Sequence, residues 1–204
     1  MATNLVSTIT LLYSMQQDDI NALADRLLQQ RAVEWQRSIQ QELARYGCNQ
    51  SARAPVGGDA LDLFRMSEND ARSIAQTYNR ELRNQVQRLF EANPKGNRNY
   101  YISRLEAWAK RRDAYKAQQI ALNTAATTRQ LAQSRFRQQN NINSKFLFVG
   151  PPPVCITCTR LKAMGLVTQD VVNQYPSPQH LNCPHEWQDA RPKGIDCATA
   201  WAGA

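Results

Sequence analysis

Apolar residues recur at helical spacing in the first 50 positions. The segment Asn4–Met15 (NLVSTITLLYSM) places Leu5, Ile9 and Leu12 on one stripe, which predicts a short helix. Asp18 or Asp19 can cap a second helix, and Gly47 can end it. The second stripe consists of Ile20, Leu23, Leu27, Trp35, Ile39 and Leu43.

Residues 48–70 contain helix-breaking residues followed by a pattern that is typical of a helix N-terminus. Residues 48–59 contain Pro55, Gly57 and Gly58, which predict a loop, and a short helical turn is expected around Leu61–Phe64. Ser67 is followed three places on by Asp70, a spacing that resembles a capping box. We therefore expect a third helix to begin there and to end at Asn93–Gly96. Its apolar stripe is Ile74, Tyr78, Leu82, Val86 and Leu89.

The longest predicted helix runs from about residue 100 to 138. One face carries Tyr101, Leu105, Trp108 and Tyr115. Threonines in the middle of this segment lower the local helix propensity, so the sequence allows a break near them. They are Thr124, Thr127 and Thr128.

The pattern changes after Asn143, where Lys145–Val149 predicts a short strand that Gly150 and three prolines end. The expected fold is mostly α, with an elongated multi-helix body and a small C-terminal α+β module stabilised by zinc, for which the case follows. We place the body at 1–143 and the module with its tail at 144–204.

Positive charge is concentrated in the middle of the chain. Residues 1–79 carry 7 basic and 9 acidic side chains, residues 80–162 carry 16 and 4, and residues 163–204 carry 2 and 4. Such a field attracts polyanions, DNA first among them. A solvated helix surface or a basic face that meets an acidic protein are the alternatives. The candidate DNA-binding residues are Lys110, Arg111, Arg112, Lys116, Arg129, Arg135 and Arg137.

The segment Asn4–Met15 is too short for a membrane span, which needs about 20 residues. It also lacks the preceding Lys or Arg of a signal peptide. A helix this short takes its stability from packing. We expect it to dock either on the protein's own helices or, as the preferred alternative, on another subunit.

The chain has five cysteines, at 48, 155, 158, 183 and 197. An odd number with a tight C-x-x-C favours a reducing compartment and a metal over a disulfide framework. Cys48 and Cys197 belong to no pairing pattern, and we interpret them as packing residues.

Cys155-Ile156-Thr157-Cys158 and His180-Leu181-Asn182-Cys183 are two short-spaced pairs of metal ligands. Two such pairs joined by a loop are typical of a tetrahedral structural zinc site. His185 is a fifth donor and an alternative fourth ligand. Ordinary buried thiols are the other interpretation, and a redox pair is disfavoured because no βαβ pattern surrounds the motif.

A closed shell of three cysteines and one histidine leaves no open position for a catalytic water. The sequence also lacks the phosphate-binding loop G-x-x-x-x-G-K-[ST] and the nucleophile elbow G-x-S-x-G. No acidic residues cluster as a two-metal site requires. We therefore expect a protein without catalytic activity.

Residues 115–187 resemble the Mu F-like (head morphogenesis) minor head proteins of tailed phages. That family shows a long Arg/Gln-rich helix, a short strand, a C-x-x-C-x-x-L-x-G element and a proline-rich approach to H-x-N-C-R-C. The matching residues are Cys155, Cys158, Leu161 and Gly165 (one place late), then Pro176, Pro178, His180, Asn182 and Cys183. His185 replaces the family's last cysteine, and Pro184 replaces the arginine before it.

The resemblance implies a virion protein, made in the host cytoplasm and located at the portal inside the head. It would act in head assembly or in DNA packaging and delivery. Its partners would be the portal or other head and neck proteins in an oligomeric or ring assembly, with packaged DNA as a non-specific neighbour. A head-to-tail connector ring is the main alternative, and a zinc-bearing DNA-binding regulator is less favoured.

Overall fold

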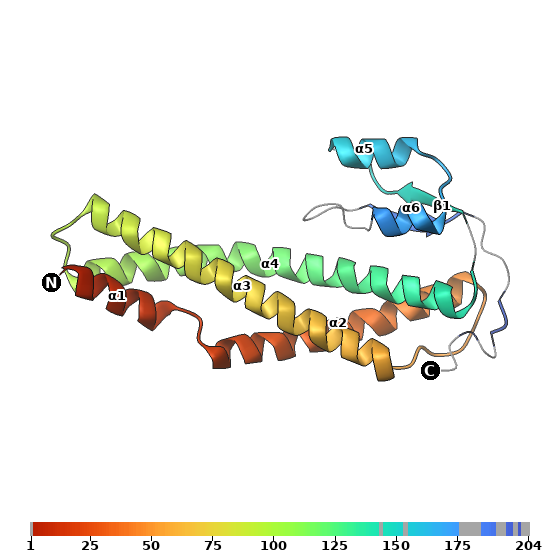
Figure 1. The fold of residues 1–204 in the computed structure, drawn as a ribbon, viewed down its shortest axis with the longest axis horizontal. Coiled ribbons are helices and arrows are strands. Elements are labelled where there is room, and N and C mark those ends of the chain that lie inside the picture. The colour runs from red at the N-terminus through yellow and green to blue at the C-terminus, as the bar shows by residue number, and fades with distance from the viewer. Residues whose placement is uncertain are drawn as a thin grey trace. The chain divides into compact units, whose positions relative to one another are not determined.

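The computed structural model describes residues 2–142, 145–152, 155–175, 185–190, 195–197 and 200, apart from the side chains of residues 2–6, 9 and 173. The described chain is mostly helical, as predicted (Figure 1). The helices are α1 (Ala2–Tyr13), α2 (Gln17–Arg45), α3 (Gly57–Ala92), α4 (Arg98–Gln139), α5 (Ile156–Ala163) and α6 (Gln169–Gln174). The strands are β1 (Phe146–Val149) and β2 (Glu186–Asp189).

The chain forms two compact units that divide the long helices between them. Unit 1 comprises residues 1–28 and 64–118, and unit 2 comprises residues 29–63 and 119–204. The sequence places a boundary near residue 143, at the end of α4. In the structure, the second half of α4 belongs to the same unit as the C-terminal strands and short helices.

Helix α3 is continuous through the point where the capping-box pattern predicts a start. It begins at Gly57 and carries Asp59 in its first turn, so the predicted start at Ser67 is wrong. Ser67 is buried inside the helix. The early start is stabilised by long-range ion pairs, because Arg135 on α4 contacts Asp59 at 3.2 Å and Asp62 at 2.7 Å.

Helix α4 also continues, through the threonines that favour a break. The hydroxyl of Thr127 donates to the Asn123 carbonyl at 2.9 Å, and that of Thr128 donates to the Thr124 carbonyl at 2.7 Å. Both hydroxyls also accept from the Arg31 guanidinium, at 3.1 and 2.9 Å. The hydroxyls are thus satisfied within the helix and against α2, which offsets their low propensity.

The core of unit 1 lies between the end of α3 and the start of α4. Its buried residues are Leu82, Val86, Tyr101 and Leu105. The rings of Phe90 and Tyr101 stack at 4.2 Å, and the Tyr101 hydroxyl donates to the Asn93 carbonyl at 2.6 Å. These contacts close the α3–α4 turn where the sequence predicts it.

The end of α1 packs on unit 1 itself. Tyr13 packs against the core, and the Asn79 side chain bonds the Met15 backbone amide at 2.9 Å and its carbonyl at 3.3 Å. Leu11 and Leu12 remain 68% and 63% exposed. None of the helices in the described ranges is long and apolar enough to cross a membrane.

Within unit 2, β1 and β2 form an antiparallel pair in which Phe146 faces Asp189 and Phe148 faces Trp187. Val167 adds a bridge to Phe146, with both backbone hydrogen bonds at 2.9 Å. A small apolar cluster covers this sheet and includes both short helices. Its buried members are Phe146, Phe148, Cys158, Leu161, Val167, Val172 and Trp187.

A disulfide joins Cys48 and Cys197, which are 149 positions apart. The interpretation of both residues as packing cysteines is therefore wrong, and no local spacing could have revealed the pair. The Gln50 side chain also donates to the Cys197 carbonyl, and the Asn140 side chain donates to the Ala200 carbonyl at 2.8 Å. Because disulfides form in oxidising surroundings, the cysteines do not indicate a permanently reducing compartment.

Replacing Cys48 with Ser should destabilise unit 2 by roughly 2–4 kcal/mol, because the disulfide closes a very long loop in the unfolded chain. Thermal unfolding with and without reductant checks this. Reductant should lower the melting temperature of the wild type and leave that of Cys48→Ser unchanged. A wild-type melting temperature that reductant does not change would contradict the Cys48–Cys197 pairing. Peptide mapping under non-reducing conditions tests the same disulfide independently.

Candidate metal centre and its polar junction

The Cys155–Cys158 turn begins helix α5. Cys155 occupies the N-cap position with extended backbone angles, and its sulfur accepts the Cys158 amide at 3.3 Å. The two side chains are thiols, half-buried at Cys155 and buried at Cys158. Amide donors at a helix N-terminus favour a negatively charged sulfur, which is the form that binds metals. The described cysteines therefore fit one end of a zinc site.

The other residues of this motif have structural roles. Leu161 is buried in the apolar cluster with Cys158, so the helix face that carries the second thiol is held against the sheet. Gly165 follows the last turn of α5 with a φ of +66°, a conformation that favours glycine. The spacing of the motif is thus accounted for by a helix that is short, capped and packed on one side.

His185 lies next to β2 in the same module and is only 2% exposed. Its Nε2 is 2.8 Å from the Pro151 carbonyl, which can only accept, so Nε2 carries the proton and Nδ1 is the nitrogen with a lone pair when the ring is neutral. The ring stacks on Phe148 at 5.3 Å. A Cβ at Gly150 would lie 2.6 Å from the ring, so glycine is required there. A carbonyl-bound imidazole is typical of metal ligands and also of buried structural histidines.

The other two predicted ligands, His180 and Cys183, lie outside the described residues. Within the described ranges, no group of three or more His, Cys, Asp or Glu side chains is placed to hold a metal ion. Cys155, Cys158 and His185 therefore belong to one module, but the described positions of the three side chains do not form a metal site.

Arg137, a predicted DNA-binding residue, lies in the interior of unit 2. Its guanidinium lies 4.7 Å over the Phe146 ring and donates to the Trp187 carbonyl at 3.5 Å. Burial lowers the pKa of Arg137, and the nearby Glu42 opposes that shift. The side chain therefore joins α4 to both strands and is inaccessible to a phosphate.

Glu42 is the buried acid of this junction. It accepts from Arg45 at 3.1 Å and from Gln133 at 3.2 Å, and its Oε2 has no hydrogen-bond partner among the described residues. Burial raises the pKa of Glu42, while Arg45 and Arg137 oppose the rise.

A tyrosine on the loop that follows α2 contacts β2 directly. The Tyr46 hydroxyl donates to Asp189 at 2.6 Å. The pKa of Tyr46 is raised by burial and by this hydrogen bond. Like Glu42 and Asp189, Tyr46 is a junction residue that the sequence analysis missed, because its contact spans 143 positions.

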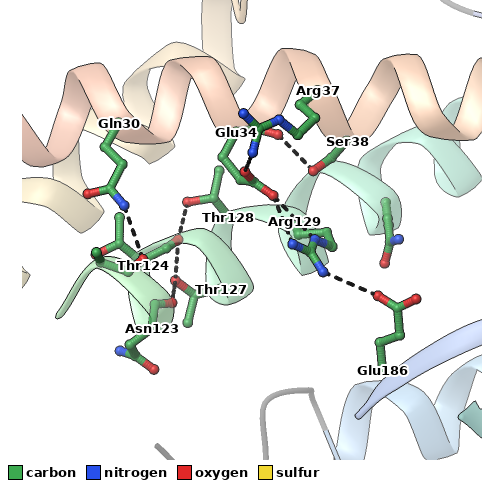
Figure 2. A network of polar contacts seen from close by, with 12 residues as sticks. Gln30, Glu34, Arg37, Ser38, Asn123, Thr124, Thr127, Thr128, Arg129 and Glu186 are labelled. Atoms are coloured by element: carbon green, nitrogen blue, oxygen red, sulfur yellow. Dashed lines mark hydrogen bonds and ion pairs between the residues drawn. The ribbon is translucent and has the colours of Figure 1, made fainter. Parts of the chain in front are cut away.

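Arg129 forms a second link between α2, α4 and β2 (Figure 2). Its Nε and Nη2 both contact Glu34 Oε1 at 3.2 Å, and its Nη1 contacts Glu186 at 3.5 Å. Glu34 is nearly buried and also pairs with Arg37 at 3.2 Å. Beside this link, the Gln30 side chain donates to the Ala121 carbonyl at 3.0 Å.

The remaining predicted DNA-binding residues divide into two groups. Arg135 pairs with Asp59 and Asp62, as described above. In unit 1, Arg112 contacts Glu81 at 2.6 Å and Lys116 contacts it at 3.9 Å. By contrast, Lys110 and Arg111 are exposed. Intramolecular partners therefore occupy most of the predicted set.

Comparison with known protein families, with characterised proteins and with solved structures finds no match for this chain.

Replacing Glu42 with Gln should leave stability at pH 8 equal to or above that of the wild type. The pKa of Glu42 is higher in the folded protein than in the unfolded chain, so the folded state binds the proton more tightly. Stability then falls as pH rises from the unfolded pKa through the folded pKa, and the ionised form is the less stable one. Urea unfolding at pH 5 and pH 8 measures this. From pH 5 to pH 8, the free energy of unfolding of the wild type should fall by an amount that is absent in Glu42→Gln. A variant that is less stable than the wild type only at pH 8 would contradict the raised pKa.

Proposed function

We propose that this chain is a non-catalytic virion protein of the tailed-phage minor head class, associated with the portal and acting in head assembly and DNA packaging or delivery. The observation that supports this most is the order of elements in unit 2. A long helix rich in Arg and Gln leads into strand β1 and then into the Cys155–Cys158 turn of α5. This is the order on which the resemblance to Mu F-like proteins rests.

The contacts of unit 2 support a structural role. Its buried charges, Glu34, Glu42 and Arg137, bond to side chains and carbonyls of neighbouring elements. These bonds are directional and favour one arrangement of helices and strands, although Glu42 Oε2 and Arg137 Nε have no hydrogen-bond partner among the described residues. A protein that must keep its form inside a particle has use for this rigidity.

We further propose a structural zinc ion held by Cys155 and Cys158, with His180 and Cys183 as the other ligands and His185 as the alternative fourth. The ion would cross-link the α5 turn to the segment before β2. The apolar cluster around the sheet has few members, so a metal would add substantially to the folding free energy of the module.

Purified full-length protein should contain about one zinc per chain. Cys155→Ser and Cys158→Ser should each release the metal and unfold the module, while most helical signal remains because α2, α3 and α4 do not depend on it. Elemental analysis and circular dichroism measure the two effects.

His180→Ala and His185→Ala distinguish the fourth ligand through zinc content. Stability alone is not decisive, because His185 also packs on Phe148. We expect metal loss in His180→Ala and retention in His185→Ala. The reverse result would assign His185 as the ligand, and freshly reduced wild type without metal would overturn the zinc proposal.

In purified particles, we expect the chain in few copies and bound to the portal protein of the same phage. Leu11→Ser with Leu12→Ser should abolish this association without unfolding the chain, because both side chains are exposed on α1. Quantitative mass spectrometry of particles assembled with each variant is the measurement.

The matched control is Val33→Ser with Leu61→Ser, which alters two exposed apolar residues of unit 2. This pair should leave particle association intact. Equal effects of both pairs would show that α1 is not the docking segment. A copy number fixed by a ring at the neck would support the connector instead, and absence from particles would refute a virion role.

A further inference from the structure

On α4, the exposed cations lie in the half that belongs to unit 1 rather than at the C-terminal end. Between residues 80 and 118 the chain has ten basic and four acidic side chains. Arg112 and Lys116 share Glu81, as described above. Exposed cations remain between residues 80 and 118, and these form no ion pair within the described part of the chain. Those used below are Arg80, Arg88, Arg98, Arg104, Lys110 and Arg111.

Helix geometry places part of this charge on one stripe of α4. Arg104, Trp108, Arg111 and Tyr115 follow at intervals of four, three and four residues, so they share a face. Arg104 and Arg111 lie about 10 Å apart along the helix axis. Tyr115 is 63% exposed, and the Arg104 guanidinium lies 5.8 Å over the Tyr100 ring.

This surface fits a nucleic acid better than a protein. Protein interfaces have a core of buried apolar residues and few charges at the centre. Among the described residues of 80–118, Tyr115 is the one large hydrophobic residue that is strongly exposed. Exposed arginines and lysines at helical spacing are instead typical of a surface that binds phosphates.

We propose that the α4 stripe of Arg104, Arg111 and Tyr115, flanked by Lys110 and Arg98, binds the phosphate backbone of duplex DNA without sequence preference. Arg80 and Arg88 on α3 add to the attracting field. Phosphate contacts orient a protein on the duplex and carry no sequence information directly. The proposal rests on the proposed function only for the source of the DNA, which is the packaged genome.

The test measures binding of the full-length protein to a random-sequence duplex by fluorescence anisotropy at several salt concentrations. The variant is Arg104→Gln with Arg111→Gln. Losing two phosphate contacts should reduce the slope of log affinity against log salt by about 2 and weaken binding on the order of 10-fold or more at low salt.

Two control pairs remove the same charge elsewhere. Arg53→Gln with Lys145→Gln changes exposed cations of unit 2, and Arg129→Gln with Arg135→Gln changes arginines that already have acidic partners. Both should keep the wild-type slope. The second pair also loses ion pairs, so circular dichroism must first show that this variant folds. If it does not fold, the comparison relies on the first pair alone.

Several outcomes would overturn the proposal. One is an equal loss of DNA affinity in the first control pair and in Arg104→Gln with Arg111→Gln. Others are a strong preference for one DNA sequence and the absence of wild-type binding at low salt. The last is binding of poly-glutamate with the same dependence on Arg104 and Arg111. Particle association is measured separately. If the chain joins the portal but does not bind DNA, only the proposed DNA-binding surface is refuted. If the chain binds DNA through this surface but is absent from particles, only the virion role is refuted.

Discussion

Arg137 and Glu42 are ionisable side chains with almost no exposure, and their contacts join α2, α4 and both strands of unit 2. A buried charge without compensation costs several kcal/mol, so each needs partners in a defined geometry. Arg137 contacts Phe146 and the Trp187 carbonyl, while Glu42 contacts Arg45 and Gln133. Apolar packing alone has no direction, whereas the Glu42–Gln133 bond links α2 to α4 and the contacts of Arg137 link α4 to both strands.

The same constraint explains why positive charge has two roles in this chain. In unit 2, arginines of α4 form ion pairs with acidic residues on α2, α3 and β2. Their positive charge is therefore compensated within the protein. In unit 1, aromatic and aliphatic side chains fill the space between α3 and α4, and cations such as Arg104 and Arg111 remain at the surface. A charge count along the sequence adds both groups together. Only the second can attract a polyanion, because the first is neutralised by nearby carboxylates.

The module around β1 and β2 is small, and its apolar cluster would be a weak domain by itself. Polar contacts from Arg129, Arg137 and Tyr46 hold it to the helices of unit 2. The Cys48–Cys197 disulfide connects the chain's end to the loop after α2 in the same unit. The proposed zinc ion would add a third kind of cross-link at the Cys155 turn. Specific bonds therefore supplement the small buried apolar area in this part of the protein.

The sequence by itself determined what neighbouring residues encode. Apolar stripes predicted α2 and α4, the Phe146–Val149 pattern predicted β1, and the spacing of Cys155 and Cys158 predicted a tight turn. Tertiary structure decided the burial of Arg137, the pairing of Cys48 with Cys197 and the passage of α3 through Ser67. The physical reason is range. Helical periodicity and caps act over a few residues, whereas burial, ion pairing and disulfide formation join positions 50 to 150 apart and depend on how the elements pack.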